Sequence, residues 1–358
     1  MIRTPLTDRL GISCPIIQTG MGYVAGARLA AATSRAGGLG VIASATMSTD
    51  ELRSAIKEVQ ERTGAPFGVN LRADAPDAGE RVDVIITEQV PVASFALAPK
   101  PELISRLRDA GVITIASVGA RRHAEKVAAW GIDAVIATGG EGGGHTGPVP
   151  TSLLIPQIVD AVGIPVIAAG GFFDGRGLVA ALAYGAAGIA MGTRFLLTSD
   201  SPVADAVKQV YLATDVTGTM VTTRVDGVPH RVLRTPLVQQ LDGAGRLSGL
   251  LRSARSAAAF RGVSGLTWPD MIRQGRAMRR DSELTWGQVL MAANTPMLLR
   301  AAMVDGRPDL GLMSAGQVAG LIDDLPSCAE LIDRIMTEAG QSLRHLGRLG
   351  GDEATDAC

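Results

Sequence analysis

Short apolar segments alternate with longer amphipathic segments from residue 15 to residue 196. The short segments are continuously apolar rather than alternating in polarity, which is typical of parallel strands covered by helices on both faces. The pattern predicts eight such strands, at residues 15–20, 38–43, 66–71, 92–97, 112–117, 134–139, 165–170 and 188–193.

The segments between these strands carry helix signals. Residues 49–64 open with a Thr-Asp pair that can cap a helix and close on a glycine, and residues 101–111 and 120–131 also end on a glycine. Eight repeats of a strand followed by a helix favour an α/β fold with a closed (β/α)₈ TIM barrel over an open doubly wound sheet.

This alternation stops after Arg194. Residues 195–308 contain helix-like segments without regular strand partners, so we expect a mostly helical insertion after the eighth strand, on the substrate side of the barrel. The barrel is expected to comprise residues 1–194 and 309–345, with its closing helices within 314–343. The polar residues 346–358 predict a disordered tail.

The composition describes an aliphatic core and a surface without strong net charge. Hydrophobic residues make up 46% of the chain and aromatic residues only 3%, so Ala, Val, Ile and Leu must fill the interior. With 34 basic and 35 acidic residues the net charge is −1, which gives no general attraction to nucleic acid or to an anionic membrane.

The cysteines and the N-terminus indicate where the protein works. Cys14, Cys328 and Cys358 are far apart and match no metal-ligand spacing, so no metal site is predicted, and a scattered odd number is typical of a reduced cytosolic protein. No apolar run reaches the ~20 residues that span a bilayer, and the N-terminus has no apolar signal core. We expect a cytoplasmic protein that acts on a small molecule, with homo-oligomerisation left open.

Small residues follow the last two predicted strands. In a barrel of this kind the loops after strands seven and eight often hold a phosphate group. The sequence there is "AGG" at 169–171 and "MGT" at 191–193, so backbone N–H groups of Gly170, Gly171 and Gly192 and the hydroxyl of Thr193 are the predicted phosphate ligands.

The segment "GGEGGGHTG" at 139–147 follows the sixth predicted strand. A strand and a helix bracket it, which excludes a flexible linker. We interpret its glycines as a close approach to a planar ring, with His145 as an acid or base because histidine changes charge near neutral pH. Glu141 either orients backbone amides or is solvated. The alternative for His145 is a loop histidine that only forms local hydrogen bonds. His123, His230 and His345 are interpreted as structural.

Polar and flexible side chains follow the first and third predicted strands. The amide of Asn70 in "PFGVNL" is placed to bind a cofactor carbonyl or phosphate, although a structural cap is the alternative. Gln18, Met21 and Gly22 in and after "PIIQTGMG" are predicted to line a cofactor ring, although methionine is more often core filler.

Taken in order, the segments "PIIQTGMG", "AGGLGVIA", "PFGVNL", "GGEGGGHTG", "PVIAAGG", "ALAYGAAGIAMGTRFL" and "GLMSAGQVAGLI" resemble the nitronate monooxygenases, formerly called 2-nitropropane dioxygenases. Those enzymes are FMN-dependent barrels that also resemble the flavin-dependent enoyl-acyl-carrier-protein reductases. The resemblance covers residues 3–322. Two departures leave the substrate open: "TGM" stands at 19–21 where the family commonly has "APM", which we expect to loosen a turn, and "EGGGH" stands where it usually has "EAGGH".

The resemblance implies a non-covalent FMN and assigns positions around it. The phosphate would lie on the glycines and threonine after strands seven and eight, and His145 would be the base. The ring would lie near Met21, Gly22, Asn70 and Gly144, with Gln317 of "SAGQ" closing over one edge.

The substrate remains a choice between a nitronate and a CoA thioester. In the second case the enzyme would be an acyl-CoA dehydrogenase or reductase of lipid or steroid breakdown, a role that similar actinobacterial enzymes have, with NAD(P)H as electron partner. An anionic substrate is also indicated by eight arginines in a stretch of the insertion with a single acidic residue, Asp270, although a solvated helical face is the alternative. The arginines stand at positions 246, 252, 255, 261, 273, 276, 279 and 280. The rival classes are a non-enzymatic FMN sensor or scaffold and a phosphate-binding isomerase or aldolase. The absence of a lysine at a predicted strand end argues against the aldolase.

Overall fold

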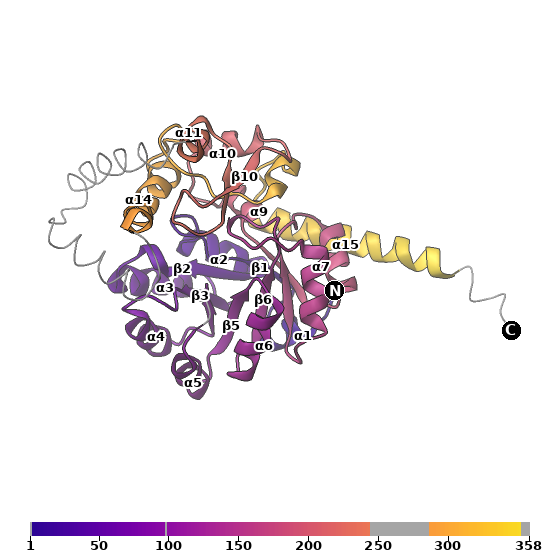
Figure 1. Cartoon of the computed structure of the whole chain (residues 1–358). Helices are drawn as coiled ribbons and strands as arrows, with labels where there is room; N and C mark the ends of the chain where they lie inside the picture. Colours follow the sequence, from indigo (N-terminus) through magenta and orange to yellow (C-terminus); the bar gives the residue numbers. More distant parts are fainter. Residues whose placement is uncertain (1, 97–98, 244–285, 352–358) are drawn as a thin grey trace. The chain divides into compact units, whose positions relative to one another are not determined.

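The computed structural model describes residues 2–96, 99–243 and 286–351, and the chain divides into two compact units (Figure 1). The barrel unit comprises Met1–Gly142, Gly147–Pro202 and Ile322–Cys358, and the second unit comprises Gly143–Thr146 and Val203–Leu321. The division therefore falls eight residues beyond Arg194, and the short segment 143–146 belongs with the insertion rather than with the barrel.

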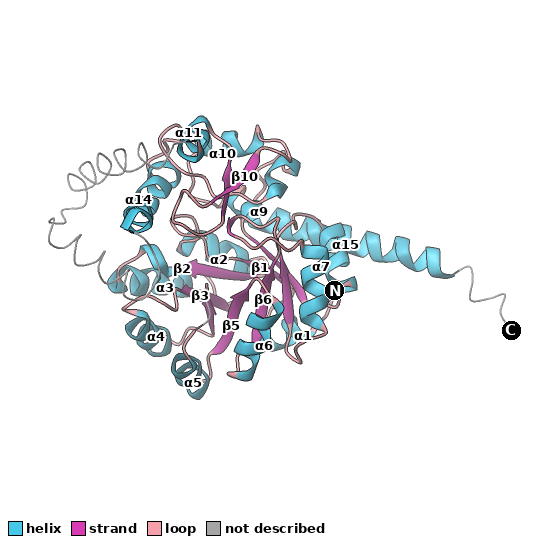
Figure 2. Cartoon of the chain, in the orientation of Figure 1, coloured by secondary structure: helices cyan, strands magenta, loops and turns pink. Residues whose placement is uncertain are grey.

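Eight parallel strands close into a barrel, which confirms the predicted TIM barrel (Figure 2). Each strand lies inside a predicted segment, except that β5 extends one residue beyond the end of its segment. The ring closes where β1 pairs with β9, with Ile17 opposite Ala190. In order around the barrel the strands are β1(Ile16–Gln18), β2(Leu39–Ala43), β3(Phe67–Leu71), β4(Val92–Phe95), β5(Ile113–Val118), β6(Ala134–Thr138), β8(Val166–Ala169) and β9(Gly188–Met191).

Aliphatic side chains fill the interior of the barrel, as the scarcity of aromatic residues requires. Ile17, Leu39, Val92 and Ile167 belong to one buried cluster and are at most 1% exposed. Burying each such side chain contributes roughly 1.5–3 kcal/mol. The interior is thus a packed core, and only the ends of the strands are available for chemistry.

Helices surround the strands. The third of them begins with a capping box, in which the Ser48 hydroxyl accepts from the Glu51 N–H and the Glu51 carboxylate accepts from the Ser48 N–H. The helices of the barrel unit are α1(Pro5–Leu10), α2(Ala27–Arg35), α3(Thr49–Arg62), α4(Ala78–Thr87), α5(Pro101–Asp109), α6(Arg121–Ala129), α7(Thr151–Val159), α8(Gly175–Ala183), α9(Thr193–Leu196) and α15(Cys328–Gly351), with a 3₁₀ turn η1(Ser44–Thr46).

The last helix, α15, packs along α8. A Cβ atom at Gly175 would lie 2.4 Å from the backbone nitrogen of Ala339, so the two helices approach as closely as glycine allows. The disordered tail predicted from residue 346 is wrong for 346–351, which continue α15. Leu346 lines the groove against α8 together with Ser342, so the helix still has apolar contacts there. Residues 352–358 lie outside the described part of the chain.

The second unit contains a small antiparallel sheet that the sequence did not predict. Strands β10(Thr219–Thr222) and β11(His230–Leu233) form a hairpin, and β11 also pairs with the two-residue strand β7(Gly144–His145). The helical elements of this unit are α10(Asp205–Leu212), α11(Pro236–Asp242), α14(Trp286–Met303) and the 3₁₀ turn η2(Gln317–Leu321). The insertion, expected to be mostly helical, therefore also contains a small sheet. The eight arginines at 246–280 lie outside the described residues.

Among the described residues, no helix is long and apolar enough to cross a membrane.

Candidate active site

The carboxyl ends of the parallel strands meet at one end of the barrel, where active sites of this fold lie. Nine residues that the sequence predicts to bind a cofactor lie at that end, in the last residues of the strands or in the segments that follow them. They are Gln18, Met21, Gly22, Asn70, Glu141, Gly170, Gly171, Gly192 and Thr193.

Gln18 is completely buried, which does not fit the predicted ring-lining role. Its Nε2 donates to the Val41 carbonyl at 3.1 Å, and its Oε1 accepts from the Val41 N–H at 3.2 Å. Both ends of the amide are therefore used to join β1 to β2. Gln18 supports the loop after β1 rather than facing a ligand.

Asn70 lies half-buried at the end of β3, in register with Ser94 of β4. Its Nδ2 is 3.4 Å from both the carbonyl and the hydroxyl oxygen of Ser94, so these hydrogen bonds are long. A Cβ atom at Gly20 would lie 2.5 Å from the Asn70 Cβ. The glycine of "TGM", expected to loosen this turn, is instead in close contact with Asn70.

The loops after β1 and β9 also approach each other closely. A Cβ atom at Gly192 would lie 3.2 Å from the Thr19 hydroxyl and 3.4 Å from the Met21 sulfur. Met21 is half-buried, Gly22 is exposed, and Thr193 is buried at the first position of α9. A larger residue than Gly192 would therefore force the Thr19 or Met21 side chain to shift.

Gly170 and Gly171 after β8 have consecutive left-handed backbones, with φ of +94° and +85°. A Cβ atom at Gly171 would meet only the side chain of Glu141, at 3.7 Å. The backbone of Gly171 is therefore uncovered at the end of the barrel. Exposed amides of this kind form anion-binding surfaces, so the position suits a phosphate group.

Glu141 links three loops at this end of the barrel. Its two carboxylate oxygens lie 3.2 and 3.0 Å from the backbone N–H of Thr151, and the Thr151 hydroxyl lies 2.7 Å from Oε2 and 2.9 Å from the Gly170 carbonyl. Thr151 is the first residue of α7, where a negative charge is favourable. Of the two interpretations, the structure favours the one in which Glu141 orients backbone amides.

Three of the six glycines at 139–147 are required by contacts within the chain rather than by a planar ring. A Cβ atom would lie 2.1 Å from the Thr151 hydroxyl at Gly139, 2.8 Å from Thr138 Cγ2 at Gly142, and 2.5 Å from the Gly316 nitrogen at Gly143. By contrast, Gly144 has φ of +76° and open space around its Cβ position. Close approach to a ring remains an explanation for Gly144 alone among these four.

His145 lies on β7 in the second unit, directly opposite His230 of β11. The two ring centroids are 4.7 Å apart, with an angle of 57° between the ring planes. His145 Nε2 is 2.7 Å from Oδ2 of Asp226, which lies in the connection between β10 and β11. The His145 side chain is 57% exposed, whereas that of Asp226 is 14% exposed.

His230, interpreted from the sequence as structural, belongs to the same cluster. Its Nε2 is 2.8 Å from the Ser314 hydroxyl, and its buried Nδ1 has no hydrogen-bond partner. That Nδ1 lies 3.7 Å from Oδ2 of Asp226. Ser314 is fixed by Tyr211, whose buried hydroxyl donates to the Ser314 carbonyl at 2.8 Å. Gln317 follows three residues later, half-buried in η2.

Asp226 is an anion in this cluster. Burial acts to raise its pKa, but the interactions of the carboxylate, chief among them the hydrogen bond from His145, outweigh burial and hold the pKa of Asp226 well below its usual range. An ionised carboxylate only accepts, so the proton between the two side chains is on His145 Nε2. The neutral His145 ring then has its lone pair on Nδ1, which is the nitrogen that can act as a base.

Sequence reasoning identified His145 but missed Asp226, His230 and Ser314. The signal for two of them was the segment "RVDGVPHRV" at 224–232, in which an Asp-Gly pair between β-prone residues indicates a hairpin. Such a hairpin places Asp226 at its turn and His230 at the start of its second strand.

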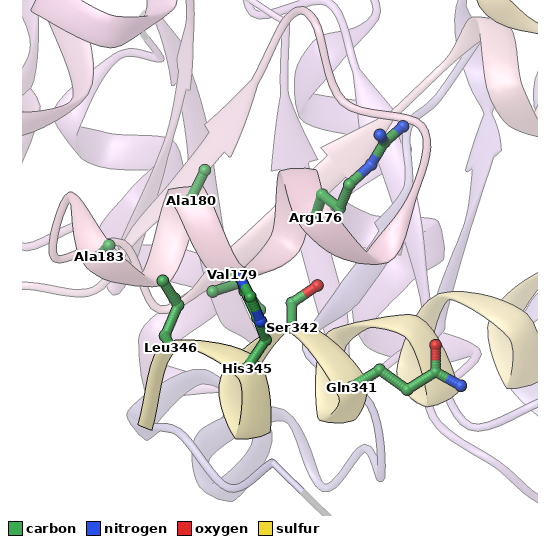
Figure 3. A pocket seen from close by; sticks show the side chains of 8 residues that line it. All are labelled: Arg176, Val179, Ala180, Ala183, Gln341, Ser342, His345 and Leu346. Atoms are coloured by element: carbon green, nitrogen blue, oxygen red, sulfur yellow. The ribbon is translucent and has the colours of Figure 1, made fainter. Parts of the chain in front are cut away.

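An open groove of about 490 Å³ lies elsewhere, between α8 and α15 (Figure 3). Val179, Ala180, Ala183 and Leu346 give it an apolar lining, with Arg176 at one side. It lies between the outer helices and contains none of the predicted site residues.

A family model described as nitronate monooxygenase matches residues 3–83 and 79–338. A protein of Mycobacterium tuberculosis (strain ATCC 25618 / H37Rv) is 64% identical over 341 residues, which are 94% of this chain and 96% of that protein. Its name is (3aS,4S,5R,7aS)-5-hydroxy-7a-methyl-1-oxo-octahydro-1H-indene-4-carboxyl-CoA dehydrogenase.

A dehydrogenase of the same name from Rhodococcus jostii (strain RHA1) is 57% identical over 348 residues, which are 97% of this chain and 99% of that protein. Among solved structures, FabK from Thermotoga maritima superposes with a TM-score of 0.80 at 36% identity, over 97% of this chain and 99% of that chain.

Proposed function

Because this chain, an oxidoreductase, belongs to the nitronate monooxygenase family, we propose that it uses FMN to dehydrogenate a hydroxylated, ring-containing acyl-CoA thioester. The observation that carries the substrate class is the match, at 64% and 57% identity and over nearly the whole length, to two dehydrogenases named for such a thioester. This substrate is the CoA alternative to a nitronate that the sequence left open.

The loops of the barrel unit fit the cofactor that we propose. The uncovered backbone at Gly171, beside Gly170, suits the phosphate, together with Gly192 and Thr193 after β9. The long hydrogen bonds of Asn70 to Ser94 leave its amide able to turn to a ring carbonyl. When bound, FMN supplies the redox step by taking up a hydride equivalent from the substrate.

His145 is the proposed base. The carbonyl of a thioester acidifies the C–H bond on the adjacent carbon, and His145 Nδ1 accepts that proton while Asp226 holds Nε2–H. Loss of one proton and one hydride equivalent oxidises the substrate by two electrons. We propose NAD(P)⁺ as the acceptor that removes these electrons from the enzyme.

An anaerobic titration of the purified enzyme tests this function. Adding a β-hydroxyacyl-CoA should bleach the oxidised flavin, and NAD⁺ or NADP⁺ should then restore its colour. The His145→Gln variant should keep its flavin, but the rate at which the flavin bleaches should fall by about 10²-fold or more. His123→Gln is the matched control, because His123 is exposed on α6 and we expect it to behave like the wild type. A colourless purified protein would contradict the proposal that it binds FMN. A wild-type rate in His145→Gln would contradict the assignment of His145 as the base.

Nitronate oxidation is the second candidate, favoured by the description of the matching family model. The same preparation should then consume oxygen when given an alkyl nitronate. Faster turnover with the nitronate than with any acyl-CoA would replace the thioester as the proposed substrate.

A further inference from the structure

We propose that His145, Asp226 and His230 form a binding site for a divalent transition-metal ion of the zinc class, and that an ion bound there withdraws His145 from proton transfer. The binding site stands on the geometry of the second unit alone. Its inhibitory consequence rests on the proposed function, because it requires His145 to be the base.

The ligand atoms come together because of strand pairing. His145 and His230 are opposite each other on β7 and β11, and Asp226 lies in the hairpin connection four residues before His230. One nitrogen from each histidine and one carboxylate oxygen lie within 4.8 Å of one another. Two imidazole nitrogens and a carboxylate oxygen are ligands that zinc prefers, and three protein ligands leave a fourth position for water.

The state of His230 is an independent indication of a missing ligand. The His230 side chain is only 6% exposed, and its Nδ1 is a buried nitrogen without a hydrogen-bond partner. Leaving a buried polar atom without a partner is unfavourable, and coordination to a metal ion would offset this cost. When Nε2–H donates to the Ser314 hydroxyl, the lone pair of His230 lies on Nδ1, on the side of Asp226. A hydrogen bond on the far nitrogen is what fixes a metal-binding histidine in this way.

The exposure of His145 provides the route of entry. Its side chain is 57% exposed, whereas the other two ligands are largely buried. His145 Nε2–H donates a hydrogen bond to Asp226, and the same nitrogen would have to lose its proton to bind the ion. The hydrogen bond that positions the base and the metal bond therefore exclude each other.

Zinc binding to the flavin-loaded enzyme tests the site without any measurement of turnover. Cys14→Ser and Cys358→Ser should form the background, so that thiolates do not contribute. Equilibrium dialysis against Zn²⁺ alone should give one ion per chain. Asp226→Asn, His230→Gln and His145→Gln should each weaken binding by about 100-fold. His123→Gln, on an exposed helix of the barrel unit, should bind as the background does.

Equal zinc affinity in all four variants, or no binding to the background protein, would overturn the proposal. Since His230 is buried and its replacement can disturb folding, the exposed His145→Gln variant keeps the test decisive. Zn²⁺ should also inhibit turnover, and EDTA should reverse the inhibition. Binding as expected with undiminished turnover would retain the site and overturn its inhibitory role together with the assignment of His145 as base.

Discussion

Asp226 determines which nitrogen of His145 is free. The carboxylate occupies Nε2 at 2.7 Å, and this leaves Nδ1 with the lone pair. His145 could be predicted from the sequence because a lone histidine in a glycine-rich loop after a strand is conspicuous. The hairpin that carries Asp226 has a sequence signal, but its contact with His145 could not be predicted, because only the pairing of β7 with β11 brings together two residues that are 81 positions apart in the chain.

Replacing Asp226 with Asn tests this positioning role. The ring of His145 loses its anionic partner, so turnover should fall by about 10- to 100-fold while KM and the flavin spectrum stay unchanged. Steady-state kinetics that separate kcat from KM check this. Asp215→Asn is the matched control, because the carboxylate of exposed Asp215 accepts from the backbone N–H and the hydroxyl of Thr217, with no histidine involved in either bond. A rise in KM with unchanged kcat would contradict the role.

The same substitution has a pH signature in stability. Because the folded pKa of Asp226 is depressed, its stabilisation is complete above the unfolded pKa of about 3.9 and is lost as the pH falls below it, by about 1 kcal/mol per pH unit. The wild type should thus be more stable than Asp226→Asn at pH 5 to 6, with a smaller difference at pH 3. Denaturant unfolding at these pH values measures the prediction. If the difference in the free energy of unfolding between the two proteins were the same at both, the carboxylate would not be held as an anion.

At the scale of elements, the structure separates strong signals from weak ones. The eight barrel strands were predictable because each is a continuous apolar run buried on both faces. Strand β7 was not, since two residues carry no periodicity and become a strand only by pairing with β11. The glycines of its loop were interpreted as facing a ring, whereas three of the six fit contacts with Thr151, Thr138 and Gly316 that only a folded chain reveals.

The contact between α8 and α15 gives a prediction at this scale. In Gly175→Ala the added Cβ would lie 2.4–2.5 Å from the backbone of Ala339 and Ile335, so the helices must separate. We expect a loss of about 2 kcal/mol in the free energy of unfolding, measured by denaturant titration. Gly347→Ala on α15 is the control, because nothing lies within 4 Å of its Cβ position, and it should gain up to about 1 kcal/mol. Equal effects of the two substitutions would reject the close packing.

At the scale of the whole molecule, the proposed roles are divided between the units. The phosphate-binding glycines and Asn70 belong to the barrel unit, whereas Gly144, His145 and Gln317 belong to the second unit. The sequence predicted both sets but assigned residues 143–146 to the barrel, because it could not reveal that β11 takes them as a neighbour.

Removing the flavin tests the whole-molecule assignment. A ligand present at 100 times its Kd stabilises the folded state by about 2.7 kcal/mol, so the apoprotein should melt several degrees below the flavin-loaded protein. In Gly171→Ala the added Cβ covers the proposed phosphate surface, and this difference should shrink.

Gly111→Ala controls for backbone strain in that experiment. Gly111 has φ of +76°, close to the +85° of Gly171, but its Cβ position is open. It lies between α5 and the start of β5, away from the carboxyl ends of the strands. The Gly111→Ala variant should lose stability as Gly171→Ala does, but its melting temperature should still rise fully when the flavin binds. A full flavin effect in both variants would remove Gly171 from the cofactor site.

The membership of Gly143–Thr146 in the second unit limits how this enzyme can be recombined with its relatives. The segment from Val203 to Leu321 looks like a self-contained cassette in the linear sequence, yet the outer partner of β11 is encoded far upstream of it. A chimaera that exchanged residues 203–321 alone would pair β11 of one protein with β7 of the other. Exchange of substrate preference between homologues should therefore succeed only when both stretches are grafted as a set.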